Sequence, residues 1–321
     1  MPLPLVGTLH RKRFYQDDSN LEIRHRILEF NNSPKFEQLK IELDKIGATY
    51  SLHLLGRIGG KESYSIEFYI SENDPRYPYI QDLIIKYQFQ VQTGTYYTEQ
   101  DIASAEWLYA NAGEYQYPQP EDGSYLQATY EISNYCMRCG MGATQNRPFR
   151  LKMDFKQRTN QFLGLHWVFD EIFIRPIAKS IIEDEGVTGI EYIHPVLDRT
   201  SEAVETVFQM KIKTTVRPGM ITDDLNTVTC KENNEEWKFG GIRKGLEGYP
   251  FCGRVKYSYP RRDSIKFRRE CFDRIPDIVR SHEYFGTGRA AHQLILVSRK
   301  FVDIVTKKKF RGLKFTPISL V

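Results

Sequence analysis

Two cysteine–glycine motifs, far apart along the chain, constrain its fold more than any other feature of the sequence. In the first, Cys136-Met-Arg-Cys139-Gly140, a pair of thiols separated by two residues is followed directly by glycine. This spacing is typical of half a tetrahedral metal knuckle, because the glycine allows a tight turn that points backbone amides at the thiolates. The second motif is incomplete: Cys252-Gly253 repeats its last two residues, but the preceding cysteine, Cys230, lies well before them.

The segment from Lys231 to Phe251 separates the second pair of cysteines. It is polar and rich in glycine, which is typical of a loop inserted into what would otherwise be another Cys-x-x-Cys-Gly motif. Four thiolates would leave no coordination position for a water, so we expect a structural ion without Lewis-acid chemistry. We therefore predict one zinc ion with these ligands: Cys136, Cys139, Cys230 and Cys252.

The remaining features of the cysteines agree with metal binding. A thioredoxin-like redox pair is the alternative, but it should open a helix, and Gly140 and Gly142 disfavour a helix here. The fifth cysteine, Cys271, has apolar neighbours at helical spacing and is expected to be buried. An odd count of cysteines with one Cys-x-x-Cys favours a reducing compartment. No apolar run approaches the roughly 18 residues that span a bilayer. We expect a cytoplasmic protein with no membrane partner.

Chain length and patterning suggest an α+β protein with two parts. At 321 residues, 40% hydrophobic and 27% charged, the chain can form two folded domains. Before residue 112 the pattern predicts a helix near 36–46, a hairpin of strands at 49–55 and 63–70, and a helix over 103–110. Residues 113–125, rich in Tyr, Pro, Asp and Gly, are typical of a linker. We predict an N-terminal α+β domain at 1–112, this linker, and a zinc-knuckle domain at 126–321.

A weak internal repeat runs through the C-terminal part. Ile181-Ile182 with Gly189 matches Ile304-Val305 with Gly312 at the same offset, so helices are predicted at Pro176–Glu185 and Ser298–Lys308, each followed by a strand. The interpretation is two helix–strand lobes, at about 165–197 and 290–318, joined by the four-cysteine zinc knuckle. Chance similarity of two short units is the alternative.

Two other stretches could carry chemistry. His282 and Glu283 precede a Gly-x-Gly sequence, but neighbouring residues of a strand point to opposite faces, and the phosphate-loop residues are missing. A structural turn is favoured there, and the chain is not expected to be an enzyme. The stretch from His166 to Glu171 is typical of a buried strand ending in an acidic turn, with Trp167 in the core.

A basic segment alternates with Tyr257, Tyr259 and Phe267, which is compatible with nucleic acid because arginines bind phosphates and aromatic rings stack on bases. A net charge of +4 is weak evidence for such a partner, and a solvated surface is the favoured interpretation. The candidate contacts to nucleic acid or another partner are Arg254, Arg261, Arg262, Arg268 and Arg269.

These residues resemble the bacterial double-CXXCG-motif proteins, which are related to immunity proteins of polymorphic toxin systems. The resemblance covers about residues 97–321. It rests on the first motif, on Cys252-Gly253-Arg254 as the remainder of a split second motif, and on a C-terminal block from Glu283 to Pro317. It implies a non-catalytic protein that binds and neutralises a cognate toxin. The alternative is a zinc-stabilised nucleic-acid-binding or phage-defence component.

Overall fold

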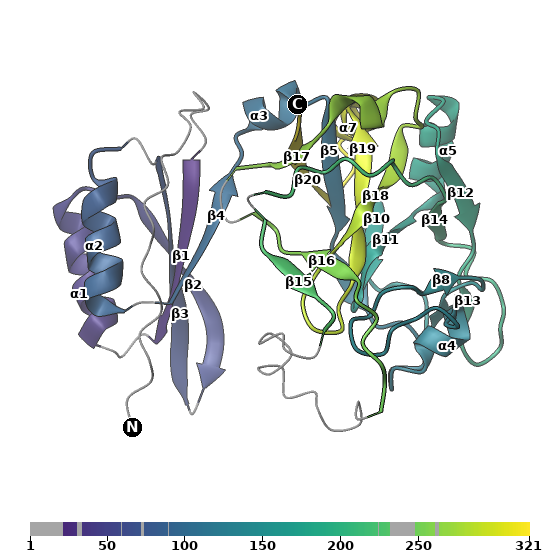
Figure 1. The fold of residues 1–321 in the computed structure, drawn as a ribbon, viewed down its shortest axis with the longest axis horizontal. Helices are drawn as coiled ribbons and strands as arrows, with labels where there is room; N and C mark the ends of the chain where they lie inside the picture. Colours follow the sequence, from purple (N-terminus) through teal and green to yellow (C-terminus); the bar gives the residue numbers. More distant parts are fainter. Residues whose placement is uncertain are drawn as a thin grey trace. The chain divides into compact units, whose positions relative to one another are not determined.

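The computed structural model describes residues 22–30, 34–58, 60–71, 74–88, 90–223, 225–231, 248–260 and 263–321 (Figure 1). The chain forms two compact units, which divide between Tyr96 and Tyr97. Both units combine helices with β-sheet, which confirms the α+β class. Within the described ranges, no helix has the length and apolar character needed to cross a membrane.

The first unit is an antiparallel four-stranded sheet with two helices on one face (Figure 1). Its elements are β1 (Glu22–Phe30), α1 (Pro34–Lys45), β2 (Tyr50–Ile58), β3 (Lys61–Ser71), α2 (Tyr77–Tyr87) and β4 (Gln90–Tyr96). The βαββαβ succession and the strand order β2-β3-β1-β4 give a ferredoxin-like arrangement. The core of this unit follows from the spacing of apolar residues in its elements. Phe36, Leu39 and Leu43 recur at helical spacing on one side of α1. Alternate residues of β3, such as Ile66 and Phe68, face them. The predicted helix near 36–46 and the hairpin are confirmed.

The second unit is built on two larger sheets. A seven-stranded sheet has the order β15-β16-β18-β19-β5-β20-β17, and a five-stranded sheet has the order β12-β14-β11-β10-β6. The strands of the first sheet are β5 (Trp107–Ala112), β15 (Thr227–Thr229), β16 (Val255–Tyr257), β17 (Ile265–Phe267), β18 (Ile278–Phe285), β19 (His292–Ser298) and β20 (Leu313–Leu320). Those of the second are β6 (Glu114–Gln116), β10 (Phe162–Leu165), β11 (Val168–Ile174), β12 (Ile190–Ile193) and β14 (Phe208–Ile212).

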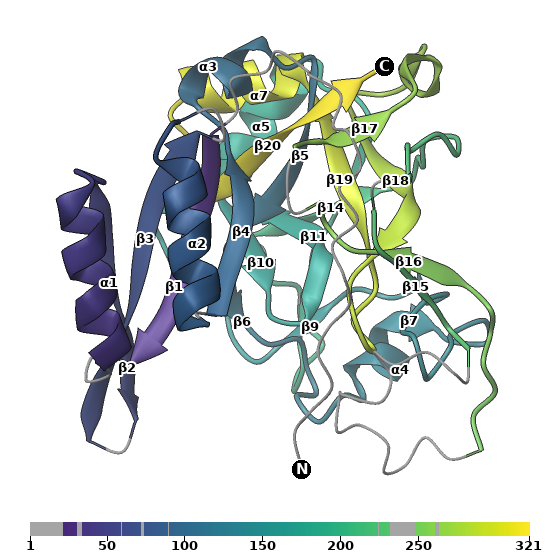
Figure 2. The same ribbon diagram turned by 60° about the vertical axis from the view of Figure 1, so that its left-hand side comes forward.

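Shorter elements complete this unit. The helices are α3 (Glu99–Ser104), α4 (Tyr125–Thr129), α5 (Pro176–Asp184), α7 (Arg299–Lys307) and the 3₁₀ turn η1 (Arg269–Phe272). Two small ladders pair β7 (Tyr130–Glu131) with β8 (Thr144–Gln145), and β9 (Arg150–Leu151) with β13 (Val196–Leu197). Strands β15 and β16 lie at the same end of the unit as β7 and α4 (Figure 2).

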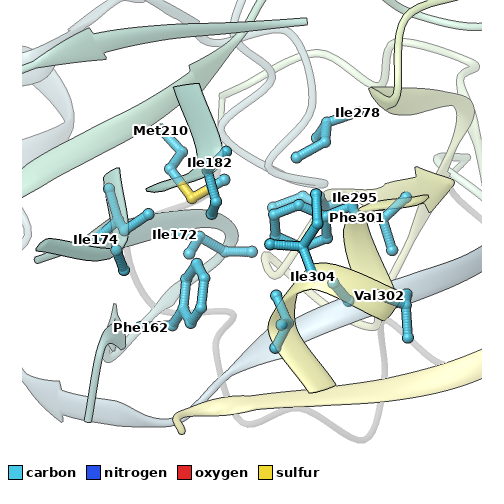
Figure 3. Packing of buried hydrophobic residues seen from close by; sticks show 14 of the residues in the cluster. Phe162, Ile172, Ile174, Ile182, Met210, Ile278, Ile295, Phe301, Val302 and Ile304 are labelled. Carbon is cyan, nitrogen blue, oxygen red and sulfur yellow. The ribbon is translucent and has the colours of Figure 1, made fainter. Parts of the chain in front are cut away.

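The main core is shared by both sheets and by α5 and α7. Ile295 and Val297 of β19 point into this core, whereas Leu294 and Leu296, on the opposite face of the strand, belong to a second cluster. Figure 3 shows Ile182 of α5 in the same cluster as side chains of α7. Strand β19 is therefore buried on both faces, which explains its nearly continuous apolar sequence.

The two predicted helix–strand segments are present and share this single core. Helix α5 connects β11 to β12, which both pair antiparallel with β14; helix α7 connects β19 to β20, which both pair antiparallel with β5. Each segment is thus a split β–α–β unit with one antiparallel strand between its own two. The cysteines lie outside both segments, so the shared core, and not the cysteine cluster, connects them.

The predicted domain boundary differs from the structure. Residues 107–112 form β5, in the middle of the seven-stranded sheet, and β6, within the predicted linker, pairs with β10. The helix predicted over 103–110 ends at Ser104, although the Thr98 capping box that starts it is present. The reason is tertiary: the partners of β5 are β19 and β20, almost 200 positions further along, so local composition did not reveal a strand there.

Candidate metal centre

The first cysteine knuckle follows β7 and is closed by two backbone hydrogen bonds. The amide of Gly140 donates to the carbonyl of Cys136 at 2.8 Å, and the amide of Cys136 donates to the carbonyl of Met141 at 2.8 Å. Gly140 has φ +80°, in the left-handed region that favours glycine. An added Cβ there would lie 1.9 Å from the carbonyl oxygen of Arg289, so the close backbone approach also requires glycine.

The second pair of cysteines repeats this geometry. The amide of Gly253 donates to the carbonyl of Cys230 at 3.1 Å, and the amide of Cys230 donates to the carbonyl of Arg254 at 2.9 Å. Gly253 has φ +71°. Each of these two bonds has its counterpart in the first knuckle. In both knuckles the amide of the first cysteine donates to the carbonyl of the residue after the glycine. The segment between Cys230 and Cys252, most of which lies outside the described residues, therefore leaves the knuckle hydrogen bonds intact.

The two knuckles bring the four predicted sulfur atoms together. The Sγ atoms of Cys136 and Cys230 are 3.8 Å apart, those of Cys139 and Cys252 are 3.6 Å apart, and all four lie within 4.8 Å of one another. A tetrahedral zinc ion with Zn–S bonds of about 2.3 Å requires sulfur atoms about 3.8 Å apart. Three of the cysteines are buried and Cys252 is exposed. These four residues could hold a metal ion.

The local environment gives the thiols of the cluster different pKa values. Burial opposes ionisation of Cys136, but hydrogen bonds from the amides of Cys139 and Arg138 lower its pKa to about 7. Burial raises the pKa of Cys230 to about 11 and also raises that of Cys139. A cation among the sulfurs would favour their thiolate forms, as metal binding by cysteine requires.

Reciprocal contacts fasten the two knuckles to each other. Arg138 of the first knuckle donates to the carbonyl of Tyr249 and lies over the ring of Phe251, 4.0 Å from its centroid. Arg254 of the second donates to the carbonyls of Asn134 and Met141, both at 3.0 Å. Each arginine thus holds the opposite loop, so the alignment of the sulfurs does not depend on an ion alone.

A fully buried lysine binds the backbone of the first knuckle. The Nζ atom of Lys256 on β16 donates to the carbonyls of Cys139 at 3.1 Å, Gly288 at 2.6 Å and Ala290 at 2.9 Å. The ammonium group therefore joins the knuckle to the turn between β18 and β19. The sequence predicted no role for this residue. Its only sequence signal is its place in a short strand directly after the second knuckle.

Two of the five candidate nucleic-acid contacts are occupied by internal interactions. Arg254 holds the first knuckle, and Arg269 forms a two-fold ion pair with Glu106 at 2.8 and 2.9 Å. Arg268 is exposed. Arg261 and Arg262 lie outside the described residues. The aromatic residues of this segment differ: Phe267 is fully buried, whereas Tyr259 is 41% exposed and its hydroxyl lies 2.9 Å from Nε2 of His292.

His282 and Glu283 do not form a shared site. They lie in an irregularity of β18, where His282 is exposed and Oε1 of Glu283 accepts from the amides of Gly219 and Met220 at 3.3 Å. Both residues therefore belong to a strand, and the turn predicted for this stretch lies beyond Phe285, where β18 ends. The fifth cysteine, Cys271, is buried as predicted, in close contact with the backbone of Gly219.

The structure corrects the interpretation of residues 166–171. Trp167 is 48% exposed and has φ +68°, because it lies in the two-residue connection between β10 and β11, where hairpin turns use positive φ. Asp170 and Glu171 lie within β11 and not in a turn. Regular alternation predicts which residues of a strand are buried, but it gives no information at a hairpin turn.

Next to the first knuckle is a cavity of about 390 Å³, which the sequence analysis did not anticipate. The knuckle loop lines one side through Gly140, Gly142 and Ala143. Strand β11 lines another side through Asp170 and Glu171. The residues of this cavity come from five separate parts of the chain, so no local motif could have revealed it.

A buried ion network lies in this cavity. The guanidinium group of Arg280 is 2.6 Å from Oε1 of Glu171 and 3.1 Å from Oδ2 of Asp170. Burial raises the pKa of Glu171. Burial lowers the pKa of Arg280, but the two carboxylates outweigh this effect and hold the pKa above its ordinary value. The arginine thus stays charged, and Gln209 donates to the other oxygen of Glu171 at 2.8 Å.

No known protein family and no curated protein matches this sequence. The resemblance to the double-CXXCG-motif proteins therefore stays a prediction, which rests on the cysteine motifs and the C-terminal block.

Proposed function

We propose that this chain is a non-catalytic, immunity-type protein of the cytoplasm that binds and neutralises a cognate bacterial toxin, with a structural zinc ion in its scaffold. The observation that carries the proposal is the equivalence of the two knuckles, which have the same backbone hydrogen bonds around Gly140 and Gly253. It supports the interpretation of Cys230 and Cys252 as one split Cys-x-x-Cys-Gly motif. That motif pair is the main basis of the resemblance.

In this proposal zinc acts as a cross-link. The four thiolates of Cys136, Cys139, Cys230 and Cys252 hold it, and they fill its tetrahedral coordination. The ion joins the loop after β7 to the strands β15 and β16, which are distant in the sequence. Because a structural site has no open position, the ion would supply stability and not activation of water.

The metal part of the proposal is tested by elemental analysis of the purified protein. We expect about one zinc per chain, following the four-thiolate site. The Cys139→Ser variant should lose the ion, whereas Cys271→Ser, which changes an equally buried cysteine outside the cluster, should retain it. Retention of zinc by the Cys139→Ser variant would contradict the proposed ligand set.

The immunity part is tested by co-expression with the product of a neighbouring toxin gene in bacteria. Growth should be restored by the wild-type chain, and a stable complex of the two proteins should be isolated. The Cys139→Ser variant should lose this protection if the zinc scaffold shapes the binding surface. Neither rescue nor complex formation would contradict toxin neutralisation, while leaving the zinc result unaffected.

The nucleic-acid alternative has less support. Two of its five candidate arginines, Arg254 and Arg269, already bind groups of this chain. Freeing them for phosphate would break these contacts. It would be favoured only if salt-dependent binding to DNA or RNA were observed.

A further inference from the structure

We propose that the cavity beside the first knuckle binds a small organic cation with a planar head, of the amidinium or guanidinium class. This site is separate from the metal ligands, and the inference does not depend on the proposed neutralising function. Three observations carry it: an unbalanced buried charge, a set of aromatic walls, and a half-exposed tryptophan that is held beside the cavity by two tyrosines.

The buried charges in the cavity do not balance. Asp170 and Glu171 share one guanidinium group, that of Arg280, whose remaining donors bind the carbonyls of Asp170 and Ile212. Gln209 binds Glu171 but is neutral. With both carboxylates ionised, as their contacts with the Arg280 guanidinium favour, the three groups together carry a net charge of −1. The side chain of Glu171 is 5% exposed and that of Asp170 is 23% exposed, so Asp170 is the carboxylate that a ligand can reach.

The walls suit a cation. Six aromatic side chains line the cavity: Tyr125, Tyr130, Tyr135, Trp167, Phe169 and Tyr284. The face of an aromatic ring carries negative charge density, and it attracts ammonium or guanidinium groups within about 6 Å. A volume of about 390 Å³ is at the lower end of the range for small-ligand sites, enough for one ring with a short polar head.

Trp167 contributes an indole ring to the lining of the cavity. It lies in the hairpin turn between β10 and β11, next to the strand that carries Asp170. Its ring centroid lies 4.6 Å from that of Tyr117 and 6.2 Å from that of Tyr125. These contacts hold the indole in position beside the cavity, although nearly half of its surface is exposed.

Other cationic side chains line the cavity but have less influence on its interior. Lys213 is exposed and pairs with Glu191, Lys211 is half-buried, and Arg289 is exposed. Charges in contact with solvent are screened far more than the buried group formed by Asp170, Glu171 and Arg280. The buried charge therefore determines the sign of the ligand, and the exposed cations would act only on its outer end.

Three molecules of the same shape test this proposal: benzamidinium, benzamide and benzoate, with charges of +1, 0 and −1. Each is titrated into the full-length, zinc-loaded protein by calorimetry, and the quenching of tryptophan fluorescence is followed in parallel. We expect benzamidinium to bind at least about tenfold more tightly than benzamide, which corresponds to about 1.4 kcal/mol, and benzoate to bind most weakly.

Two variants assign the effect to the cavity. Asp170→Asn keeps the shape and an oxygen for Arg280, and it should remove most of the preference for benzamidinium over benzamide. Trp167→Phe should weaken binding of the cation, because phenylalanine attracts cations less than tryptophan does. Asp303→Asn, which removes an exposed carboxylate on α7 outside the cavity, is the matched control and should bind as the wild type does.

Several results would overturn the proposal. Equal affinities for the three probes, tighter binding of benzoate, or no binding of any probe at about 1 mM would each exclude a cation site. So would an Asp170→Asn variant that retains the full preference while its circular dichroism and zinc content match the wild type.

Discussion

Gly140 and Gly253 occupy equivalent positions in the two knuckles, but their surroundings differ. Both have positive φ, so any other residue costs about 1–2 kcal/mol of backbone strain at either position. A Cβ on Gly140 would collide with the carbonyl of Arg289, whereas a Cβ on Gly253 meets no atom of the described residues within 4 Å. Substitutions at Gly140 and Gly253 therefore distinguish two costs. Both positions carry the cost of a left-handed backbone conformation, and only Gly140 also carries the cost of a steric clash.

We predict that Gly140→Ala destabilises the protein by about 2–5 kcal/mol, because overpacking adds to the strain. Gly253→Ala, the matched control, should cost only about 1–2 kcal/mol. Urea denaturation of both variants in a buffer that contains zinc measures the difference. Equal losses of stability would mean that the turn before Ala290 moves aside freely.

The ammonium group of Lys256 leads to a second prediction at this scale. Lys256→Met keeps most of the side-chain volume but leaves the carbonyls of Cys139, Gly288 and Ala290 without this donor. Unsatisfied buried polar groups make a loss of about 2–4 kcal/mol the expected result. Lys314→Met, at an exposed position of β20, should change stability by less than about 0.5 kcal/mol. Chemical denaturation measures the stability of both variants. An unchanged stability of Lys256→Met would show that water replaces the ammonium group.

At the level of single residues, the sequence identified the four cysteines but not the groups that support them. A Cys-x-x-Cys-Gly motif is local, so its chemistry can be recognised without knowledge of the fold. Lys256 and Arg280 gave no such signal, because their partners lie on other strands. Trp167 was placed in the core because the pattern of a strand was extended through a turn.

Between elements, Asp277 connects the two split β–α–β units. Its Oδ2 accepts from the amide and hydroxyl of Thr188, before β12, and its Oδ1 accepts from the hydroxyl of Ser298, the N-cap of α7. Burial opposes ionisation of Asp277, but hydrogen bonds from Thr188 and Ser298 keep its pKa below the ordinary value of 3.8. The charged carboxylate is therefore the form that the folded protein stabilises.

We predict that Asp277→Asn lowers the stability at pH 7 by about 1–3 kcal/mol, the range for hydrogen bonds to a charged group. Because the pKa is lowered in the folded protein, this contribution is complete above pH 3.8 and is lost as the pH falls through the folded value. The difference between wild type and variant should therefore shrink in acid. Urea titrations at neutral and acidic pH measure it, and a difference independent of pH would exclude the carboxylate as its source.

Prediction from sequence was better for elements with local partners than for those with distant ones. The helices α5 and α7 were predicted at their positions from the internal repeat, which aligns Ile181-Ile182 with Ile304-Val305 ahead of a glycine. Strand β5 was mistaken for a helix, and the linker-like composition of residues 113–125 placed the boundary at residue 112. Its neighbours β19 and β20 come from the end of the chain, so its central place could not be inferred from the residues around Trp107.

On the scale of the whole molecule, the two units have separate hydrophobic cores. The cysteines belong entirely to the second unit, and their loop lines the cavity. Loss of the proposed ion should therefore affect the second unit and leave the first unchanged.

We predict that a zinc chelator increases hydrogen exchange in residues 134–142, 228–231 and 252–256, with little change in the strands β1 to β3. The same treatment should weaken benzamidinium binding, because Gly140 and Gly142 line the cavity. Mass spectrometry of exchanged peptides provides the measurement, with the Cys139→Ser variant as a reference that no longer responds to the chelator. Exchange that rises equally in both units would contradict their independence.

The distance along the chain between the two knuckles also determines when, during synthesis, the four thiols become available together. Cys139 and Cys252 are 113 residues apart, and ribosomes add about 5–20 residues per second. For roughly 6–23 s of synthesis, the nascent chain carries an incomplete set of the four thiols, open to oxidation or to capture of a softer ion such as copper. Correct loading with the proposed ion would therefore depend on the reducing power and the metal supply around the ribosome during that interval.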